Sequence, residues 1–393
     1  MKNAINSNFS QVKIEQTMTE IKIKDLRGVG DVELNLDDTK RVFVFFGSNG
    51  VGKTKTLEAL CFYFLARTKN FYPRNVQWND NVEFFYSVSQ YNNSINSSYG
   101  DSFRFKKSAK KKFLFGELFL LNEWKYSALA FLGSNARSQL FNKPSEAHTI
   151  KIKSTVGSEI SETINEAIFN GEMSYLGMDV DVHNWFIERA KSVNPYQVES
   201  QLKKTELDTV LQCLNKIDPL FSSDFLQIND ANQVYLKIDN QKKELSELSS
   251  GFISVVKIIQ SIINFYSGFT GGHFDLLNVK GVVLIDEIES HLHIEWQTKI
   301  VPTLKNLFPN TTFYIATHSP LVLSQLAEGE AYLLKRDADD VVRSQEINSP
   351  NTRLLENVLQ DAFDVDLNQL KRENMEHIDQ TKAKQKLLAL LNK

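Results

Sequence analysis

The sequence predicts an α/β fold with a mixed β-sheet, flanking antiparallel strands and an inserted helical lobe. Three observations predict it. An apolar run at residues 41–46 ends in a glycine-rich loop followed by an apolar helix pattern. A second apolar run, at residues 281–285, ends in two adjacent carboxylates. Between about residues 155 and 222 the apolar spacing becomes helical. Because strands buried on both faces occur mostly in parallel sheets covered by helices, the two runs predict the centre of the sheet.

The N-terminal part predicts strands before the first helix. Residues 21–24 and 32–36 alternate apolar and polar side chains, and residues 41–46 (RVFVFF) have the composition of a fully buried strand. Residues 56–67 have the pattern of a buried helix. The short strand patterns that follow lie at residues 82–86, 103–105, 113–121 and 128–132. We expect these four to form an antiparallel sheet beside the first strand–loop–helix unit.

The rest of the chain alternates helices and strands. Helical spacing over about 155–222 predicts the helical lobe, and a long apolar helix is expected over 251–266. Further strands are predicted at 225–228, 234–238, 281–285, 312–315 and 331–334, and further helices near 293–307 and 320–327. Residues 1–18 are polar and predict a flexible lead, and residues 346–393 predict a helical tail.

Composition excludes several classes of protein. The 393 residues include 45 Lys and Arg against 48 Asp and Glu, a net charge of −3, so no strongly basic or acidic segment dominates. Cys61 and Cys213 are the only cysteines, which excludes a disulfide scaffold and a multi-cysteine metal site. No stretch approaches the roughly 18 uninterrupted apolar residues of a membrane span, and the start lacks the apolar core of a signal peptide. We therefore expect a cytoplasmic protein with no membrane partner.

The strongest motif is the glycine-rich loop after residues 41–46. It has the pattern G-x-x-x-x-G-K-[ST], formed by Gly47, Ser48, Asn49, Gly50, Val51, Gly52, Lys53 and Thr54. In this context, between a strand and a helix, backbone amides surround phosphates, the lysine reaches the β and γ phosphates, and the hydroxyl binds magnesium. The loop and the adjacent Lys55 therefore predict an ATP and Mg²⁺ site.

Two carboxylates at the end of the second buried strand complete this prediction. Asp286 and Glu287 follow residues 281–285 directly. A carboxylate at this point can hold the magnesium, the role predicted for Asp286, and the next can orient or deprotonate the attacking water, the role predicted for Glu287.

Two weaker motifs lie further along. Ser249, Ser250 and Gly251 precede the long apolar helix. Serines here can simply cap the helix, but together with the Gly251 amide and the helix dipole they also predict a second anion site. His318 follows the strand at 312–315. A buried structural histidine is the alternative to the role we predict for it, which is contact with the γ-phosphate.

The order of these motifs resembles ATP-binding cassette (ABC-type) ATPases. The sequence IKDLRG at residues 23–28 and the stretch from LIDEIESHLHIEWQ to LFPNTTFYIATHSPLVLS across 284–324 are similar to the branch that includes RecF, SMC and OLD proteins. Within it, the chain resembles compact ATPases of bacterial anti-phage systems such as Septu and retrons. The resemblance implies an ABC-type P-loop ATPase domain over 19–345.

The same resemblance implies partners and mechanism. Two subunits would pair head to tail as a homodimer, or as a higher assembly of dimers, so that Ser249, Ser250 and Gly251 of one subunit contact ATP held by Lys53 of the other. Hydrolysis through Glu287 would release them. The expected role is a switch that regulates a separate effector protein, a nuclease. Phe252 and Lys55 depart from the usual family residues, which implies slow turnover, and Gln90 is the one candidate for the glutamine expected after the loop.

Two other functions stay open. A RecF-like DNA-repair ATPase would bind DNA, and residues 103–113 (FRFKKSAKKKF) combine basic and aromatic side chains that suit either nucleic acid or a solvated hairpin tip. The ATPase subunit of a transporter would need a lobe that docks on membrane helices. The mild net charge favours protein partners over DNA.

Overall fold

The computed structural model describes most of the chain. The described residues are 17–65, 67–68, 82–92, 95–105, 126–135, 158–178, 181–192, 198–272 and 275–353, with 357, 360, 369 and 372. Residues 1–16 of the predicted lead, the strand at 113–121, the basic residues 106–113 and most of the predicted tail lie outside them. Residues 17 and 18, predicted as part of the lead, belong to a strand instead.

The strands of the main sheet come from both halves of the chain. They are β1 (Thr17–Leu26), β2 (Gly30–Asp37), β3 (Val42–Phe46), β4 (Val82–Asn92), β5 (Ile95–Phe105), β6 (Ala128–Leu132), β10 (Gly281–Ile285), β11 (Thr312–Ala316), β12 (Ala331–Arg336) and β13 (Val342–Glu346). A smaller sheet contains β7 (Phe221–Ile228), β8 (Val234–Ile238) and β9 (Gln241–Glu244). The helices are α1 (Lys53–Leu65), α2 (Ser158–Asn170), α3 (Val182–Lys191), α4 (Val198–Ile217), α5 (Ser250–Thr270), α6 (Ile294–Gln297), α7 (Ile300–Leu307) and α8 (Pro320–Leu323).

The main sheet is mixed, as predicted. Its order within the described residues is β5-β4-β1-β2-β13-β12-β3-β11-β10-β6. The five strands from β12 to β6 run parallel, whereas β2, β1, β4 and β5 pair antiparallel. Every residue of β3 and β10 is buried, in accordance with their uninterrupted apolar sequences. The predicted α/β fold class with flanking antiparallel strands is therefore confirmed.

The position of β6 differs from the prediction. We expected residues 128–132 to join the antiparallel strands beside the first strand–loop–helix unit. Instead, β6 pairs parallel with β10 at the opposite edge of the sheet, with Leu132 opposite Ile285. All five side chains of β6 are buried, so this strand needs cover on both faces, and α5 packs against it. Short apolar strands do not reveal their partners, because the pairing depends on contacts distant in sequence.

The helix predicted near 293–307 is two helices. The structure has α6 at Ile294–Gln297 and α7 at Ile300–Leu307, separated at Thr298 and Lys299. Pro302 lies in the first turn of α7, where its missing amide hydrogen costs nothing, but it could not donate to residue 298 in a continuous helix. Because of this break, α6 is a separate short helix of four residues.

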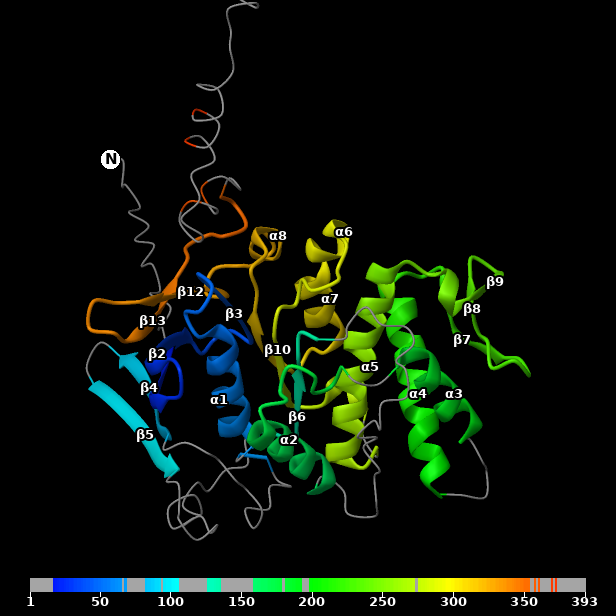
Figure 1. The fold of residues 1–393 in the computed structure, drawn as a ribbon, viewed down its shortest axis with the longest axis horizontal. Coiled ribbons are helices and arrows are strands. Elements are labelled where there is room, and N and C mark those ends of the chain that lie inside the picture. The colour runs from blue at the N-terminus through cyan, green and yellow to red at the C-terminus, as the bar shows by residue number, and fades with distance from the viewer. Residues whose placement is uncertain are drawn as a thin grey trace, which may run out of the picture.

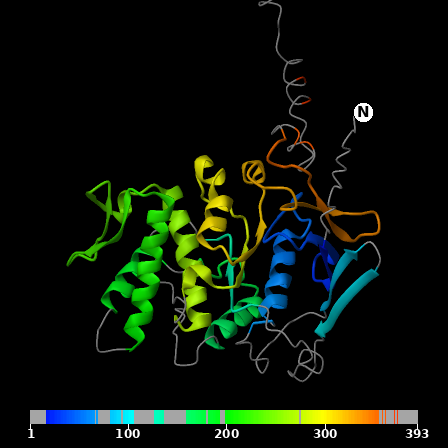
Figure 2. The ribbon, with the colours of Figure 1, turned by 180° about the vertical axis from the view of Figure 1, so that it is seen from behind.

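The two ends of the molecule are built differently. In Figure 1 the β4–β5 hairpin lies at one end, and α3, α4 and the small β7–β8–β9 sheet lie at the other, an arrangement also visible from behind in Figure 2. The long helix α5 lies between this lobe and the main sheet and packs against α4 and β6. In the described part of the chain α5 alone has the length and apolar composition of a membrane span, but 94% of that span is buried inside the protein. A core helix has the same properties.

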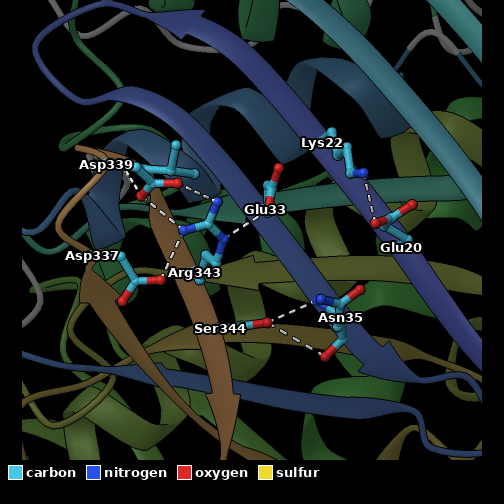
Figure 3. Close-up of polar contacts among 9 residues, drawn as sticks. Glu20, Lys22, Glu33, Asn35, Asp337, Asp339, Arg343 and Ser344 are labelled. Atoms are coloured by element: carbon cyan, nitrogen blue, oxygen red, sulfur yellow. Dashed lines mark hydrogen bonds and ion pairs between the residues drawn. The ribbon is translucent and has the colours of Figure 1, made fainter.

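An arginine joins β13 to β2, which share only a short parallel register. Arg343 donates to Glu33 on β2 at 2.8 Å and to Asp337 and Asp339 in the β12–β13 turn at 2.8 and 2.7–2.9 Å (Figure 3). One guanidinium thus connects the antiparallel half of the sheet to the parallel half.

Candidate nucleotide-binding and catalytic site

Three loops meet at one edge of the main sheet. Strands β3, β11 and β10 are adjacent and parallel, with Phe43 opposite Tyr314 and Tyr314 opposite Leu284. Their carboxyl ends therefore lie together, and this is where the loop before Lys53, the pair Asp286 and Glu287, and the segment at His318 begin. Ligands of open α/β sheets bind at this edge.

The glycine-rich loop has a backbone that side chains would obstruct. Gly47, Gly50 and Gly52 have positive φ values of +149°, +79° and +110°. A Cβ atom on Gly47 would lie 2.5 Å from the Leu334 carbonyl oxygen, and one on Gly52 would lie 2.6 Å from Val29 Cγ1. The glycines are therefore needed both for their conformations and for the close approach of neighbouring chain segments. Ser48, Asn49 and Gly50 are exposed to solvent.

Lys53 lies folded against this loop. Its side-chain ammonium donates to the carbonyl oxygens of Gly47 and Ser48, at 2.9 and 3.0 Å, and the residue is buried. Burial lowers the pKa of Lys53 to about 8, although the nearby carboxylates Asp286, Glu289 and Glu287 act in the opposite direction. A buried ammonium held only by carbonyl oxygens would gain from an anionic partner such as a phosphate. Lys55 points elsewhere and pairs with Glu58 at 2.6 Å.

Thr54 and Asp286 fit a hydrated magnesium ion. The Thr54 hydroxyl lies 3.1 and 3.0 Å from the two carboxylate oxygens of Asp286. Asp286 is only 3% exposed. Both donors are oxygens, and Mg²⁺ in phosphate sites usually has one or two protein ligands beside water and phosphate. No group of three or more His, Cys, Asp or Glu that could hold a metal occurs among the described residues. The Thr54 hydroxyl and the Asp286 carboxylate are the groups that would hold this ion. When bound, Mg²⁺ would stabilise negative charge on phosphoryl oxygens.

Glu287 has an unusual backbone conformation. Its φ is +46°, in the left-handed region that non-glycine residues seldom adopt. Its carboxylate accepts a hydrogen bond from Ser290 Oγ at 3.0 Å. The turn directs the chain away from β10 immediately after Asp286, so that the two adjacent carboxylates do not continue as a strand. Such strain is found often at functional sites.

His318 is positioned by a residue that the sequence motifs did not reveal. The carboxylate of Glu289 accepts hydrogen bonds from the Thr317 hydroxyl and from the His318 backbone amide, both at 2.6 Å. Burial, with the Lys53 charge, lowers the pKa of His318 below its usual 6.5, so the imidazole is neutral near pH 7. Glu289 could have been noticed as a third carboxylate two residues after Glu287, but its partners, Thr317 and His318, lie in a separate segment directly after β11.

Ser249, Ser250 and Gly251 lie apart from the glycine-rich loop. Ser249 caps α5 by accepting from the Phe252 amide at 3.2 Å, and both serines are exposed. Gly251 packs on the segment before α6, where an added Cβ would lie 3.1 Å from His293. In the described residues no hydrogen bond joins these three to residues 47–55. These residues therefore cap α5. As a second anion site they would have to contact a nucleotide other than one bound at residues 47–55 of the same chain.

The loop after β6 lies closer to Asp286 than the candidate Gln90 does. The Asp286 amide donates to the Leu132 carbonyl at 2.9 Å, so the segment Gly133–Asn135 begins beside the carboxylates. Gln90 is on β4 opposite Thr17, far across the strand order from β10. Gln90 is therefore not at this site. The sequence did not indicate that the segment Gly133–Asn135 lies near Asp286, because β6 was predicted to pair with the antiparallel strands and not with β10.

This fold and this arrangement of loops define a P-loop ATPase. The chain belongs to the family described as "AAA domain, putative AbiEii toxin, Type IV TA system", whose model matches residues 42–324. The match includes all the predicted site residues.

Relatives with known names agree with the resemblance seen in the sequence. The Septu protein PtuA of Bacillus thuringiensis is 24% identical over 88% of this chain and 84% of its own length. The retron Vc95 probable ATPase of Vibrio cholerae is 32% identical, over 29% of this chain and 23% of its own. The expected similarity to Septu and retron ATPases is therefore confirmed, and the chain is an ATPase.

A solved structure with a similar fold is the SMC head domain from Thermotoga maritima. It covers 84% of this chain and 99% of its own, with 12% identity and a TM-score of 0.41. The assignment of the fold rests on the strand order and the loops described above.

Proposed function

We propose that this ATPase is a switch in bacterial anti-phage defence, in which two copies close around ATP and Mg²⁺ and the closed state controls a separate effector, a nuclease. In this proposal Lys53 and the loop amides bind the phosphates, and Thr54 and Asp286 hold Mg²⁺. Glu287 orients the attacking water, and His318 contacts the γ-phosphate. The protein acts in the cytoplasm. The similarity to PtuA along most of the chain supports the defence role.

The observation that carries the dimer is the separation of the two halves of the site. Ser48, Asn49 and Gly50 are exposed on one loop, and Ser249 and Ser250 are exposed on another element, with no hydrogen bond between the two loops in the described residues. Exposed amides and a helix N-terminus are suited to an anion. In a dimer with two-fold symmetry, the glycine-rich loop of each copy would meet the serine segment of the other, which gives two complete sites.

Mixing two inactive variants tests this arrangement. Lys53→Ala removes the phosphate contact but keeps Ser249, and Ser249→Arg blocks the serine segment but keeps Lys53. If each site takes one half from each subunit, a mixed dimer has one intact site, and ATP hydrolysis by the mixture should exceed that of either variant alone. A mixture no more active than its parts would contradict a shared site.

The closed state can be observed directly. Glu287→Gln should keep ATP bound without hydrolysis, so gel filtration with ATP and Mg²⁺ should show more dimer than without nucleotide. Glu295→Gln, the same change at an exposed residue on α6, is the matched control. Equal elution of Glu287→Gln with and without ATP would count against the switch.

The division of labour needs a test in cells. Plaque assays with the neighbouring genes present should show protection that Lys53→Ala abolishes. If the protein protects when the neighbouring genes are deleted, the effector is not a separate chain.

A further inference from the structure

A single carboxylate holds the segment that contains His318. Glu289 Oε2 accepts from the Thr317 hydroxyl and Oε1 accepts from the His318 amide, both at 2.6 Å. The two carboxylate oxygens thus accept from two consecutive residues. This fixes the direction of the chain after β11 as well as its distance from Glu289. The neighbouring backbone adds a further link, because the Ile288 amide donates to the Ala316 carbonyl at 3.2 Å.

The same segment is held from its other side. The Thr317 hydroxyl oxygen accepts from the Ser319 amide at 3.0 Å, and the Ser319 hydroxyl donates to Gln297 on α6 at 2.7 Å. Gln297 in turn donates to the Leu292 carbonyl at 3.0 Å. The hydrogen bonds therefore form a chain from Glu289 through residues 317–319 to α6 and back to the loop that contains Glu289. Such a network limits the positions open to His318.

The charges around His318 give the carboxylate a second effect. Burial and, after it, the Lys53 charge lower the pKa of His318, whereas Glu289 and Glu287 raise it and also raise that of Lys53. The negative charge of Glu289 therefore partly offsets the effect of the buried ammonium on the imidazole.

We propose that Glu289 is a positioning residue for the ATPase reaction, which acts through His318 by holding the Thr317 hydroxyl and the His318 amide. The proposal rests on the catalytic role of His318 in the proposed function. Loss of the carboxylate leaves two donors without their acceptor next to the site, and the segment is then free to move the imidazole. A misplacement of about 1 Å can lower a rate on the order of a hundredfold.

The variants can separate geometry from charge. In Glu289→Gln the amide oxygen can still accept from the His318 amide, whereas the amide nitrogen can only donate to the Thr317 oxygen, so both contacts can form without the charge but the second one reverses its direction. Glu289→Ala removes both contacts. Thr317→Val removes the hydrogen bonds of the Thr317 hydroxyl to Glu289 and from the Ser319 amide, with little change of shape, and leaves Glu289 in place. Glu295→Gln and Glu295→Ala are matched controls, because Glu295 is an exposed residue whose carboxylate pairs with Lys299.

The experiment measures kcat and KM for ATP hydrolysis in these variants, in His318→Ala, and in the double variant Glu289→Ala/His318→Ala. We expect Glu289→Ala to lower kcat by about tenfold or more with KM changed less than about threefold. Glu289→Gln should recover most of that loss. The double variant should be no slower than His318→Ala, because Glu289 acts through the histidine.

Three results would overturn the inference. These are a Glu289→Ala kcat near that of the unchanged protein, losses that add in the double variant, and a loss that appears equally in KM. If Glu289→Ala does not fold, Thr317→Val decides the matter, and an unchanged kcat there overturns the inference. If His318→Ala keeps full activity, the proposed role of His318 fails. If His318→Ala is slow and Glu289→Ala is not, only the positioning role fails.

Discussion

The Thr54 hydroxyl lies 3.0 Å from Asp286 Oδ2, although 232 residues separate the two. We predict that Thr54→Ala raises the Mg²⁺ concentration for half-maximal ATP hydrolysis by on the order of tenfold, because one of two oxygen ligands is lost. Thr54→Ser keeps the hydroxyl and is the control. Titrations of MgCl₂ at fixed ATP measure the effect. A Thr54→Ala curve that coincides with that of Thr54→Ser would contradict the shared ion.

Lys53→Ala should weaken ATP binding by at least about tenfold, equivalent to about 1.4 kcal/mol. The reason is that Lys53 is a buried cation at the loop, whose ammonium donates to the Gly47 and Ser48 carbonyl oxygens. Lys55→Ala should cost less, since that side chain is half exposed and pairs with Glu58. Isothermal titration calorimetry with ATP compares the two. Equal losses would mean that the position of the charge is unimportant.

Gly52→Ala should impair ATP binding while the protein stays folded. The added Cβ would approach Val29 Cγ1 to 2.6 Å, and a φ of +110° costs a non-glycine residue about 1–3 kcal/mol. Adding Val29→Ala removes the contact but not the backbone strain, so the double variant should recover only part of the binding. Fluorescent ATP titrations measure this, with thermal melting as the check on folding. Full recovery would show that the contact alone matters.

The rate of hydrolysis should fall in acid because of His318. Burial and Lys53 lower its pKa below 6.5, while Glu289 and Glu287 oppose the shift, so the imidazole is neutral at pH 7 and gains a proton only at lower pH. We expect kcat to be level near pH 7 and to decline below 6.5. In His318→Asn, which does not titrate, kcat should be lower and this decline absent. An unchanged acid limb would assign it to another group.

Arg343→Ala should lower the melting temperature at pH 7. The reason is that the substitution removes the ion pairs of Arg343 with Glu33, Asp337 and Asp339 (Figure 3). Hydrogen bonding to Arg343 lowers the pKa of Asp339 from 3.8 to about 2. The contact between Asp339 and Arg343 therefore stabilises the fold fully above pH 3.8, and this contribution is lost as the pH falls through about 2.

The control for Arg343→Ala is Lys335→Ala, an exposed cation opposite Arg343 in the β12–β13 pair. Because these contacts are partly exposed, high salt should reduce the difference from the unchanged protein. A melting-temperature loss in Arg343→Ala that is the same at pH 7 and pH 2 would exclude the carboxylates as its cause.

Much of the fold could be predicted because its signals are local. Strands β3 and β10 are apolar throughout, and the glycine-rich loop requires positive φ values that only glycines adopt readily, so residues 42–54 and 281–287 were placed correctly from sequence. The break between α6 and α7 was missed because one proline in a first turn is compatible with a helix. The apolar run of β6 was recognised, but its partner was not.

The sequence by itself determined the chemistry available to this protein: a lysine and a hydroxyl after a glycine-rich loop, two carboxylates after a buried strand, and a histidine after another. The tertiary structure alone decided which of these groups meet. It set β6 beside β10, brought Glu289 to Thr317 and His318, and left Ser249 apart from Lys53. The physical reason is that motifs depend on short-range backbone geometry, whereas strand order and hydrogen bonds between loops depend on packing between residues tens to more than a hundred positions apart.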